Sequence, residues 1–146
     1  MERDYSIYPS MIDGEPGIVW FHNNTEKLSP MNDTFPLGVS AERCHAETLC
    51  VWYISPIWQF NDSNKTKYAL LGEWNKWTAV SRQRFLSITT NTENTQTTIV
   101  VQGLSSEVVP VVVYHSTLRS ITVNCSITAE NGQANLVITP TNAICS

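Results

Sequence analysis

The stretch SITVNCSITAENGQANLVIT, residues 120–139, decides the fold class. Its first half alternates strictly between apolar and polar side chains, which is the period-two pattern of a half-buried β-strand. Asn131-Gly132 then separates two such runs, and both residues tolerate the positive φ of a type I′ turn. The stretch therefore predicts a β-hairpin over residues 120–139 that brings Cys125 opposite Ile138.

The rest of the chain continues this pattern. Runs rich in Val, Ile, Thr and aromatic residues are broken by turn residues about every 8–12 positions, and no stretch longer than about ten residues has a helical repeat. We predict an all-β fold: a single-domain antiparallel β-sandwich over residues 1–146, immunoglobulin-like or jelly-roll-like. It would hold about nine or ten short strands and little helix. Residues 22–47 lack clear periodicity, so we expect a long irregular loop there.

Aromatic residues gather between Cys50 and Phe85. This stretch holds four of the five tryptophans and five of the nine basic residues. Its first part, Leu49–Phe60, is apolar on both faces, which predicts a central strand broken near Ser55-Pro56.

The composition limits the classes of partner. Charged residues make up 15% of the chain, well below the roughly 25% that is usual in soluble domains, and the net charge is −4. An acidic chain lacks the dense basic stripe that phosphate neutralisation needs, so we expect no nucleic-acid partner. No apolar run approaches the ~20 residues that cross a bilayer, so we expect no membrane insertion. The charged N-terminus lacks the apolar core of a signal peptide, which fits an excised domain with an added initiator Met.

The cysteines and glycosylation motifs favour an extracellular or virion-surface protein. Four cysteines in a small Thr- and Asn-rich chain predict disulfides, and we favour Cys44–Cys50 and Cys125–Cys145, since both close local loops. The alternatives are Cys50–Cys125, which would join two sheets, and four free thiols in a reducing compartment. Asn-x-Ser/Thr motifs mark five candidate glycosylation sites: Asn23, Asn32, Asn61, Asn64 and Asn124.

Motifs of catalysis and metal binding are missing from the sequence. Neither G-x-S-x-G, H-E-x-x-H nor a phosphate-binding glycine loop occurs. Cys44-His45 and Cys50 lack the paired spacing of a structural zinc site, so we expect neither a metal nor another cofactor. Asp62 and Glu73 flank the aromatic stretch and form the candidate carboxylate pair of a glycoside-acting enzyme.

A binding site is better supported than an active site. Trp74 and Trp77 lie next to a glycine in a polar context, whereas most tryptophans of a β-sandwich belong to its core. An exposed indole can anchor a protein interface or stack on a sugar ring. With Lys76, Arg82 and Arg84, the two tryptophans make up the predicted binding site.

These patterns lead to a prediction of function. We expect a non-catalytic recognition or attachment domain that binds a protein receptor or a glycan, such as a projecting domain of a viral capsid or another extracellular assembly. Self-association into a homo-oligomer is compatible with that setting. The alternatives are an accessory domain of a secreted carbohydrate-active enzyme or adhesin, and a small glycoside-acting enzyme. All three are analogies at the level of the fold.

Overall fold

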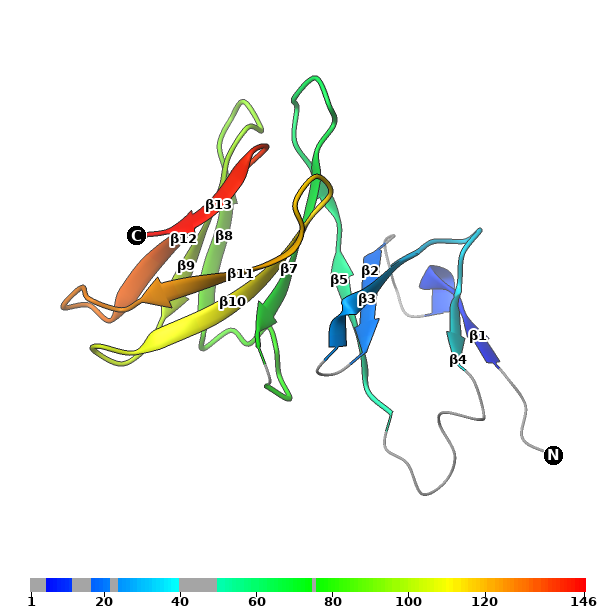
Figure 1. Ribbon diagram of the computed structural model, residues 1–146, viewed down its shortest axis with the longest axis horizontal. Helices are drawn as coiled ribbons and strands as arrows, with labels where there is room; N and C mark the ends of the chain where they lie inside the picture. Colours follow the sequence, from blue (N-terminus) through cyan, green and yellow to red (C-terminus); the bar gives the residue numbers. More distant parts are fainter. Residues whose placement is uncertain (1–4, 12–16, 22–23, 40–49, 75) are drawn as a thin grey trace. The chain divides into compact units, whose positions relative to one another are not determined.

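A computed structural model of the chain describes residues 5–11, 17–21, 24–39, 50–74 and 76–146. These residues form thirteen strands in four antiparallel sheets, with one three-residue 3-10 turn (Figure 1). The predicted all-β class is confirmed, while the choice between the immunoglobulin-like and jelly-roll-like forms stays a prediction. The chain divides into two compact units, residues 1–57 and 58–146, which we describe separately. The prediction of one domain over the whole chain stays a prediction.

The first unit contains two small sheets and the 3-10 turn η1 (Pro9–Met11). β1 (Tyr5–Ile7) pairs with β4 (Leu37–Val39), and β2 (Gly17–Phe21) is the middle strand between β3 (Asn24–Met31) and β5 (Trp52–Pro56). The prediction of an irregular loop over residues 22–47 was therefore wrong, because β3 and β4 lie within it. The sequence of β3, NTEKLSPM, has no apolar alternation. Pairing with β2 specifies this strand, and a pairing partner cannot be read from the strand's own sequence.

The apolar run Leu49–Phe60 is not one central strand. β5 ends at Pro56, and β6 (Trp58–Gln59) begins after a one-residue break. Each is the edge strand of its sheet, β5 in the first unit and β6 in the second. Proline lacks the N–H that would continue a ladder, which accounts for the break.

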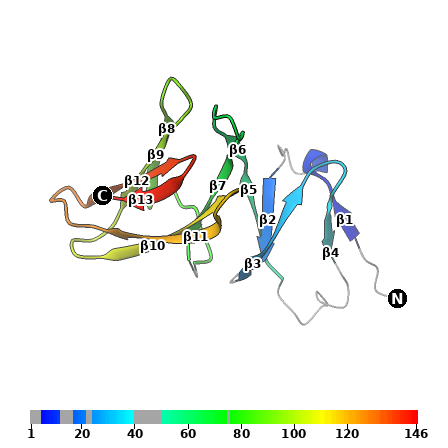
Figure 2. The same ribbon diagram turned by 45° about the horizontal axis from the view of Figure 1, so that its top comes forward.

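The second unit consists of two four-stranded sheets. One has the order β11 (Arg119–Ser126), β10 (Val108–His115), β7 (Lys67–Glu73), β6; the other has the order β13 (Asn142–Cys145), β12 (Gln133–Thr139), β9 (Thr97–Gln102), β8 (Phe85–Thr90). Successive hairpins alternate between the sheets: β6–β7 and β10–β11 build the first, and β8–β9 and β12–β13 build the second (Figure 2).

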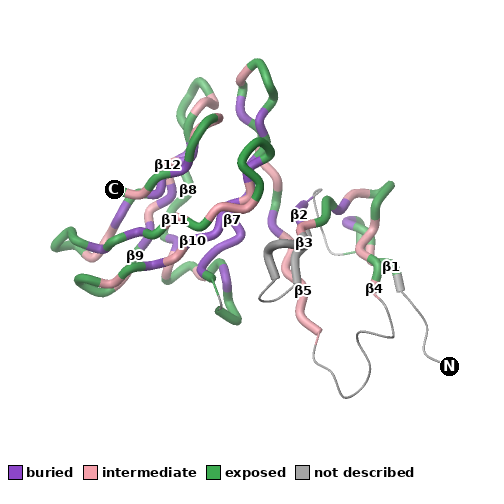
Figure 3. The backbone as a smooth tube through the Cα atoms, viewed as in Figure 1, coloured by how far each residue is buried: buried purple, intermediate pink, exposed green. Residues whose placement is uncertain are grey.

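The core of the second unit lies between these sheets. Buried residues alternate with more exposed ones along β9 and β12 (Figure 3), and in β12 Ala134, Leu136 and Ile138 are buried. Tyr68 packs its ring against Phe60 with centroids 4.3 Å apart, and burial of such apolar surface is the main stabilising term of a sandwich. The predicted disulfide Cys125–Cys145 is confirmed, with an S–S distance of 2.04 Å.

That disulfide joins β11 to β13 and so connects the two sheets. The alternative pairing Cys50–Cys125 is thereby wrong, although its expected role as an inter-sheet link is real. Cys50 is also disulfide-bonded, and Cys44, the partner predicted for it, lies outside the described residues.

The predicted hairpin over residues 120–139 was wrong. β11 pairs with β10 and β12 pairs with β9 and β13, so the two strands belong to opposite sheets. Gly132 has φ +70°, but Asn131 does not have a positive φ, and the turn is instead closed by the hydrogen bond from Gly132 N to Ala129 O at 2.9 Å. Cys125 and Ile138 both face the core as predicted. The alternation of apolar and polar residues determines only which side chains point inward. Two strands in facing sheets show the same alternation as two strands of one hairpin, so the pattern does not identify the pairing partner.

Candidate functional site

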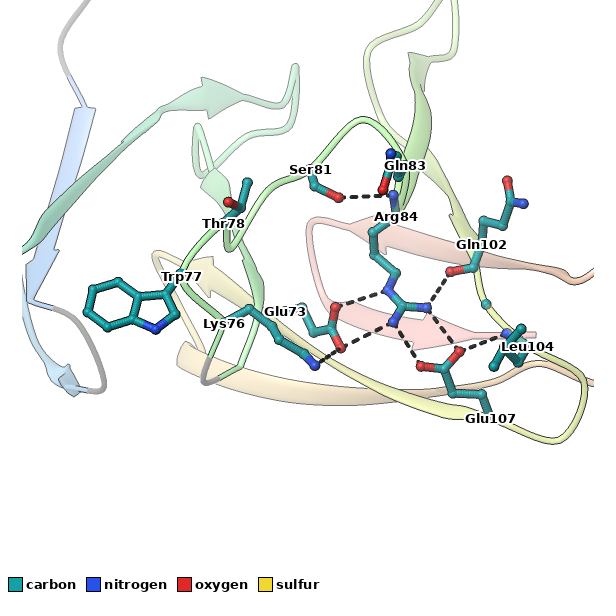
Figure 4. A pocket seen from close by; sticks show the side chains of 11 residues that line it. Glu73, Lys76, Trp77, Thr78, Ser81, Gln83, Arg84, Gln102, Leu104 and Glu107 are labelled. Carbon is teal, nitrogen blue, oxygen red and sulfur yellow. Dashed lines mark hydrogen bonds and ion pairs between the residues drawn. The ribbon is translucent and has the colours of Figure 1, made fainter.

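A pocket of about 850 Å³ lies where the β7, β8, β9 and β10 strands of the second unit begin or end (Figure 4). Its volume falls within the range of small-molecule sites. It is lined by residues from two chain segments, 73–84 and 102–107: Glu73, Lys76, Trp77, Thr78, Ser81, Gln83, Arg84, Gln102, Gly103, Leu104 and Glu107.

The segment between β7 and β8 folds back on the end of β7. Gly72 has φ +100°, and a Cβ atom there would lie 2.2 Å from the carbonyl oxygen of Ala79, so only glycine fits this position. Beside it, Glu73 N donates to Ala79 O at 2.8 Å, and Trp74 N donates to Pro110 O at 3.0 Å. These contacts fix the segment that carries Lys76 and Trp77.

Arg84 forms the centre of the pocket floor. Its Nε donates to Glu73 Oε2 at 2.9 Å, and its Nη1 donates to Gln102 O at 2.7 Å. The guanidinium also makes a forked contact with Glu107, with Nη2 2.8 Å from Oε1 and Nη1 3.1 Å from Oε2. A further contact from Nη2 to Glu73 Oε1 at 3.4 Å engages the fifth N–H group. Arg84 therefore ties the ends of both sheets together.

The charges in this cluster stabilise one another. Hydrogen bonding to Glu107, partly offset by burial, raises the pKa of Arg84, and hydrogen bonding to Glu73 adds to the rise. Contact with Arg84 lowers the pKa of Glu107, and the N–H of Leu104, 2.7 Å from Oε2, lowers it further. Lys76 places its Nζ 3.8 Å from Glu73 Oε1. Two carboxylates and two cations thus balance, and Glu107 is held in its ionised form.

Gly103 allows the cluster to close. A Cβ atom at this position would lie 2.6 Å from Glu107 Oε2, 2.8 Å from Ile127 Cγ1 and 3.0 Å from Arg84 Nη1. Any side chain at residue 103 would therefore push the carboxylate and the guanidinium apart.

The structure brings together three of the five residues predicted to bind. Lys76, Trp77 and Arg84 line the pocket, whereas Trp74 and Arg82 do not. Trp77 is 66% exposed and Trp74 37%. Figure 4 shows the indole of Trp77 set apart from the guanidinium, beyond Lys76. Because the chain itself uses all five N–H groups of Arg84, this residue shapes the pocket and Trp77 offers the exposed surface.

Sequence reasoning missed the part of the site that comes from the β9–β10 connection. Gln102 and Glu107 lie about twenty residues or more from Arg84 along the chain, and no motif links them. One signal was available in the sequence: a turn from Gly103 to Glu107 lies between two β-branched runs. Such a turn places the end of one strand close to the start of the next, where binding residues are often found.

The proposed carboxylate pair does not form. Asp62 and Glu73 flank β7 at its opposite ends, and a seven-residue strand spans roughly 20 Å. Asp62 instead holds the loop before β7, accepting hydrogen bonds from Thr66 N at 2.7 Å and Thr66 Oγ1 at 2.8 Å. Burial alone would raise the pKa of Asp62, but these bonds and one from Asn64 N lower it.

Four of the candidate glycosylation sites lie within the described residues. Asn61, Asn64 and Asn124 are exposed. Asn32 is half-buried, and its Oδ1 accepts hydrogen bonds from Thr34 N and Phe35 N, both at 2.9 Å. Asn23 lies outside the described residues, and glycosylation at all five stays a prediction.

Three further observations bear on function. Among the described residues, no three His, Cys, Asp or Glu side chains are grouped closely enough to hold a metal ion. The same part of the chain contains no helix long and apolar enough to cross a membrane. No protein-family description, curated protein or solved structure matches the chain.

Proposed function

We propose that the chain is a non-catalytic recognition module whose pocket binds a carbohydrate, with Trp77 as the stacking platform. The observation that carries this proposal is an indole that is 66% exposed at a pocket of about 850 Å³. Sugar rings present C–H faces that pack on indoles, which offer a large apolar surface and one N–H donor.

The polar lining suits the rest of a sugar. Thr78, Ser81, Gln83 and Gln102 line the pocket with hydroxyl and amide groups that can both donate and accept hydrogen bonds. Lys76, whose side chain is 57% exposed, adds a cation at the same surface. A site of one aromatic face and several neutral polar groups matches a polyhydroxylated ligand better than an apolar one.

The acidic residues of the pocket favour binding over hydrolysis. Glycoside hydrolysis requires one protonated carboxylic acid facing a second carboxylate across the sugar bond. Glu73 and Glu107 both contact the guanidinium of Arg84, which lowers the pKa of Glu107. Glu107 is therefore held in its ionised form, and the oxygens of both carboxylates are engaged with the chain's own cation.

We place this module outside the cell or on a virion surface. A buried disulfide between Cys125 and Cys145 is compatible with an oxidising environment. A projecting domain of a capsid and an accessory domain of a secreted enzyme or adhesin would both use such a surface for attachment.

Glycan-array screening of the intact chain, followed by titration calorimetry with the best ligand, tests the proposal. We expect Trp77→Ala to weaken binding at least tenfold, because the stacking platform is removed. Trp74→Ala is the matched control, because this nearby tryptophan does not line the pocket. Thermal unfolding of each variant separates loss of binding from loss of fold. Binding that is unchanged in Trp77→Ala, or an array without any ligand, would sink the proposal.

A further inference from the structure

The two most exposed large apolar side chains among the described residues of the second unit both line the pocket. Leu104 is 78% exposed and Trp77 is 66% exposed. A single exposed leucine is common on a protein surface, but two such side chains at one pocket form a paired apolar feature. Most of the surface of each lies in water, so contact with a ligand would bury apolar surface at both places.

These two side chains lie on opposite sides of the charged cluster. Trp77 belongs to the segment that follows Glu73. Leu104 lies beside the other carboxylate, where its N–H donates to Glu107 Oε2 at 2.7 Å and its carbonyl accepts from Glu107 N at 2.9 Å. Figure 4 shows Arg84 and its carboxylate partners between the indole and Leu104. A ligand that contacts both apolar side chains must therefore cross the cluster.

The cluster around Arg84 presents acceptors to a ligand and no arginine donor. The guanidinium gives all five of its N–H groups to Glu73, Glu107 and Gln102. A carboxylate can accept about four hydrogen bonds, and Glu107 accepts three, two from Arg84 and one from Leu104 N. A sugar hydroxyl can donate to the remaining site, whereas the carboxylate of an acidic sugar has no proton to give and would face both glutamates.

We propose that the pocket takes a neutral oligosaccharide of at least three rings, with one ring on Trp77, one on Leu104 and one or more over the cluster. The inference rests on the proposed carbohydrate function and adds the length and charge of the ligand. The pocket volume of about 850 Å³ lies near the top of the roughly 300–1,000 Å³ range of small-molecule sites, which is more than one sugar ring needs. The two hydrogen bonds to Glu107 hold the backbone of Leu104 in place before the ligand arrives, which lowers the cost of binding.

A glycan array that carries neutral oligosaccharides from monosaccharide to hexasaccharide, each beside a counterpart ending in a sialic or uronic acid, tests the charge of the ligand. Titration calorimetry of the whole chain with the best neutral series then tests its length. We expect the affinity to rise about tenfold between the monosaccharide and the trisaccharide or tetrasaccharide and then to level off, because only the longer ligands bury Leu104.

Leu104→Ser should remove most of this gain and leave the affinity for the monosaccharide unchanged, and Leu104→Met should retain the gain. Val108→Ser is the matched control: Val108 is 54% exposed and near in sequence but does not line the pocket. Trp77→Ala should weaken binding of every length. Thermal unfolding of each variant separates loss of binding from loss of fold.

The outcomes separate this inference from the proposed function. Affinity that is independent of ligand length, a length dependence that survives Leu104→Ser, or tighter binding of the acidic counterparts would overturn the inference, even with binding that still depends on Trp77. Binding that is unchanged in Trp77→Ala, or no binding to any sugar, would instead refute the proposed function and the inference with it.

Discussion

The two ends of β10 carry polar links of opposite character. At its start, Glu107 joins Arg84 and Glu73 in a charged cluster whose side chains are 11% to 29% exposed. At its far end, His115 is fully buried, and its ring bonds to the backbone of Thr139 in the opposite sheet and to the turn that follows β10. Both links hold the sheets together, but the charged cluster around Arg84 lies at the pocket, whereas the His115 link lies within the core.

The histidine link uses one tautomer. The N–H groups of Thr117 and Leu118 both lie 3.3 Å from Nδ1, which must therefore accept hydrogen bonds. Nε2 then carries the proton and donates it to Thr139 O at 3.0 Å. A neutral ring can be buried in this way, whereas the charges around Arg84 remain near solvent because full burial of ions costs several kcal/mol. The charged link is therefore found where a ligand could enter.

His115→Ala should produce the largest effect. The substitution removes a ring that is fully buried and takes away the side-chain partner of three backbone groups. We expect the free energy of unfolding to fall by about 3–4 kcal/mol, measured by urea denaturation. Thr117→Ala, at an exposed position beside it, is the control and should change stability by less than about 0.5 kcal/mol. A loss below about 1 kcal/mol would show that the buried link is not important for stability.

Arg84→Met tests the charged end of the comparison. The substitution removes the guanidinium between Glu73 and Glu107 and leaves Lys76, 3.8 Å from Glu73, as the nearby cation, and we expect a loss of about 2–3 kcal/mol in the same measurement. Adding Glu107→Gln to Arg84→Met should recover part of the loss, since one of the stranded charges disappears. Additive effects of the two substitutions would contradict the coupling that the geometry indicates.

Gly103→Ala should have a smaller effect, of about 1–2 kcal/mol. The new Cβ atom would displace the Glu107 carboxylate, which lies 2.6 Å from its position. Gly38→Ala is the matched control, because nothing lies within 4 Å of a Cβ atom there. Equal stability of the two variants would mean that the strand ends move apart without cost.

Most of the fold could be predicted from local patterns, but its pairings could not. The alternation around Cys125 correctly predicted a strand and its inward face. It could not distinguish a hairpin partner from a residue across the core, because both patterns have a period of two. Strand β3 was missed for the opposite reason, since its polar sequence has no alternation and its partner is a neighbouring strand.

The candidate site was predicted where exposed side chains follow one another in sequence. Trp77 and Lys76 were found from their polar neighbourhood next to a glycine. Arg84 was placed correctly but its role was not foreseen, because its partners Gln102 and Glu107 meet it only through the pairing of β8 with β9 and of β7 with β10. Contacts between strand ends depend on which strands pair, and the local patterns of a single sequence do not reveal those pairings.

The smallest expected effect is the pH dependence of stability that Glu107 adds to the charged link at the start of β10. Contact with Arg84 lowers the pKa of Glu107 below its ordinary value of about 4.3. The unfolded chain then binds the proton more readily than the folded one, so this contribution to stability is present above pH ~4.3 and is lost as the pH falls through the folded-state pKa. We expect wild-type stability to fall more steeply below pH ~4.3 than that of Glu107→Gln, which has no proton to bind at this position. Asp62, whose pKa is also lowered, titrates in both proteins and cancels in the difference, because its partners Thr66 and Asn64 are unchanged. Parallel curves from urea denaturation at stepped pH would show that Arg84 does not hold Glu107 in its charged form.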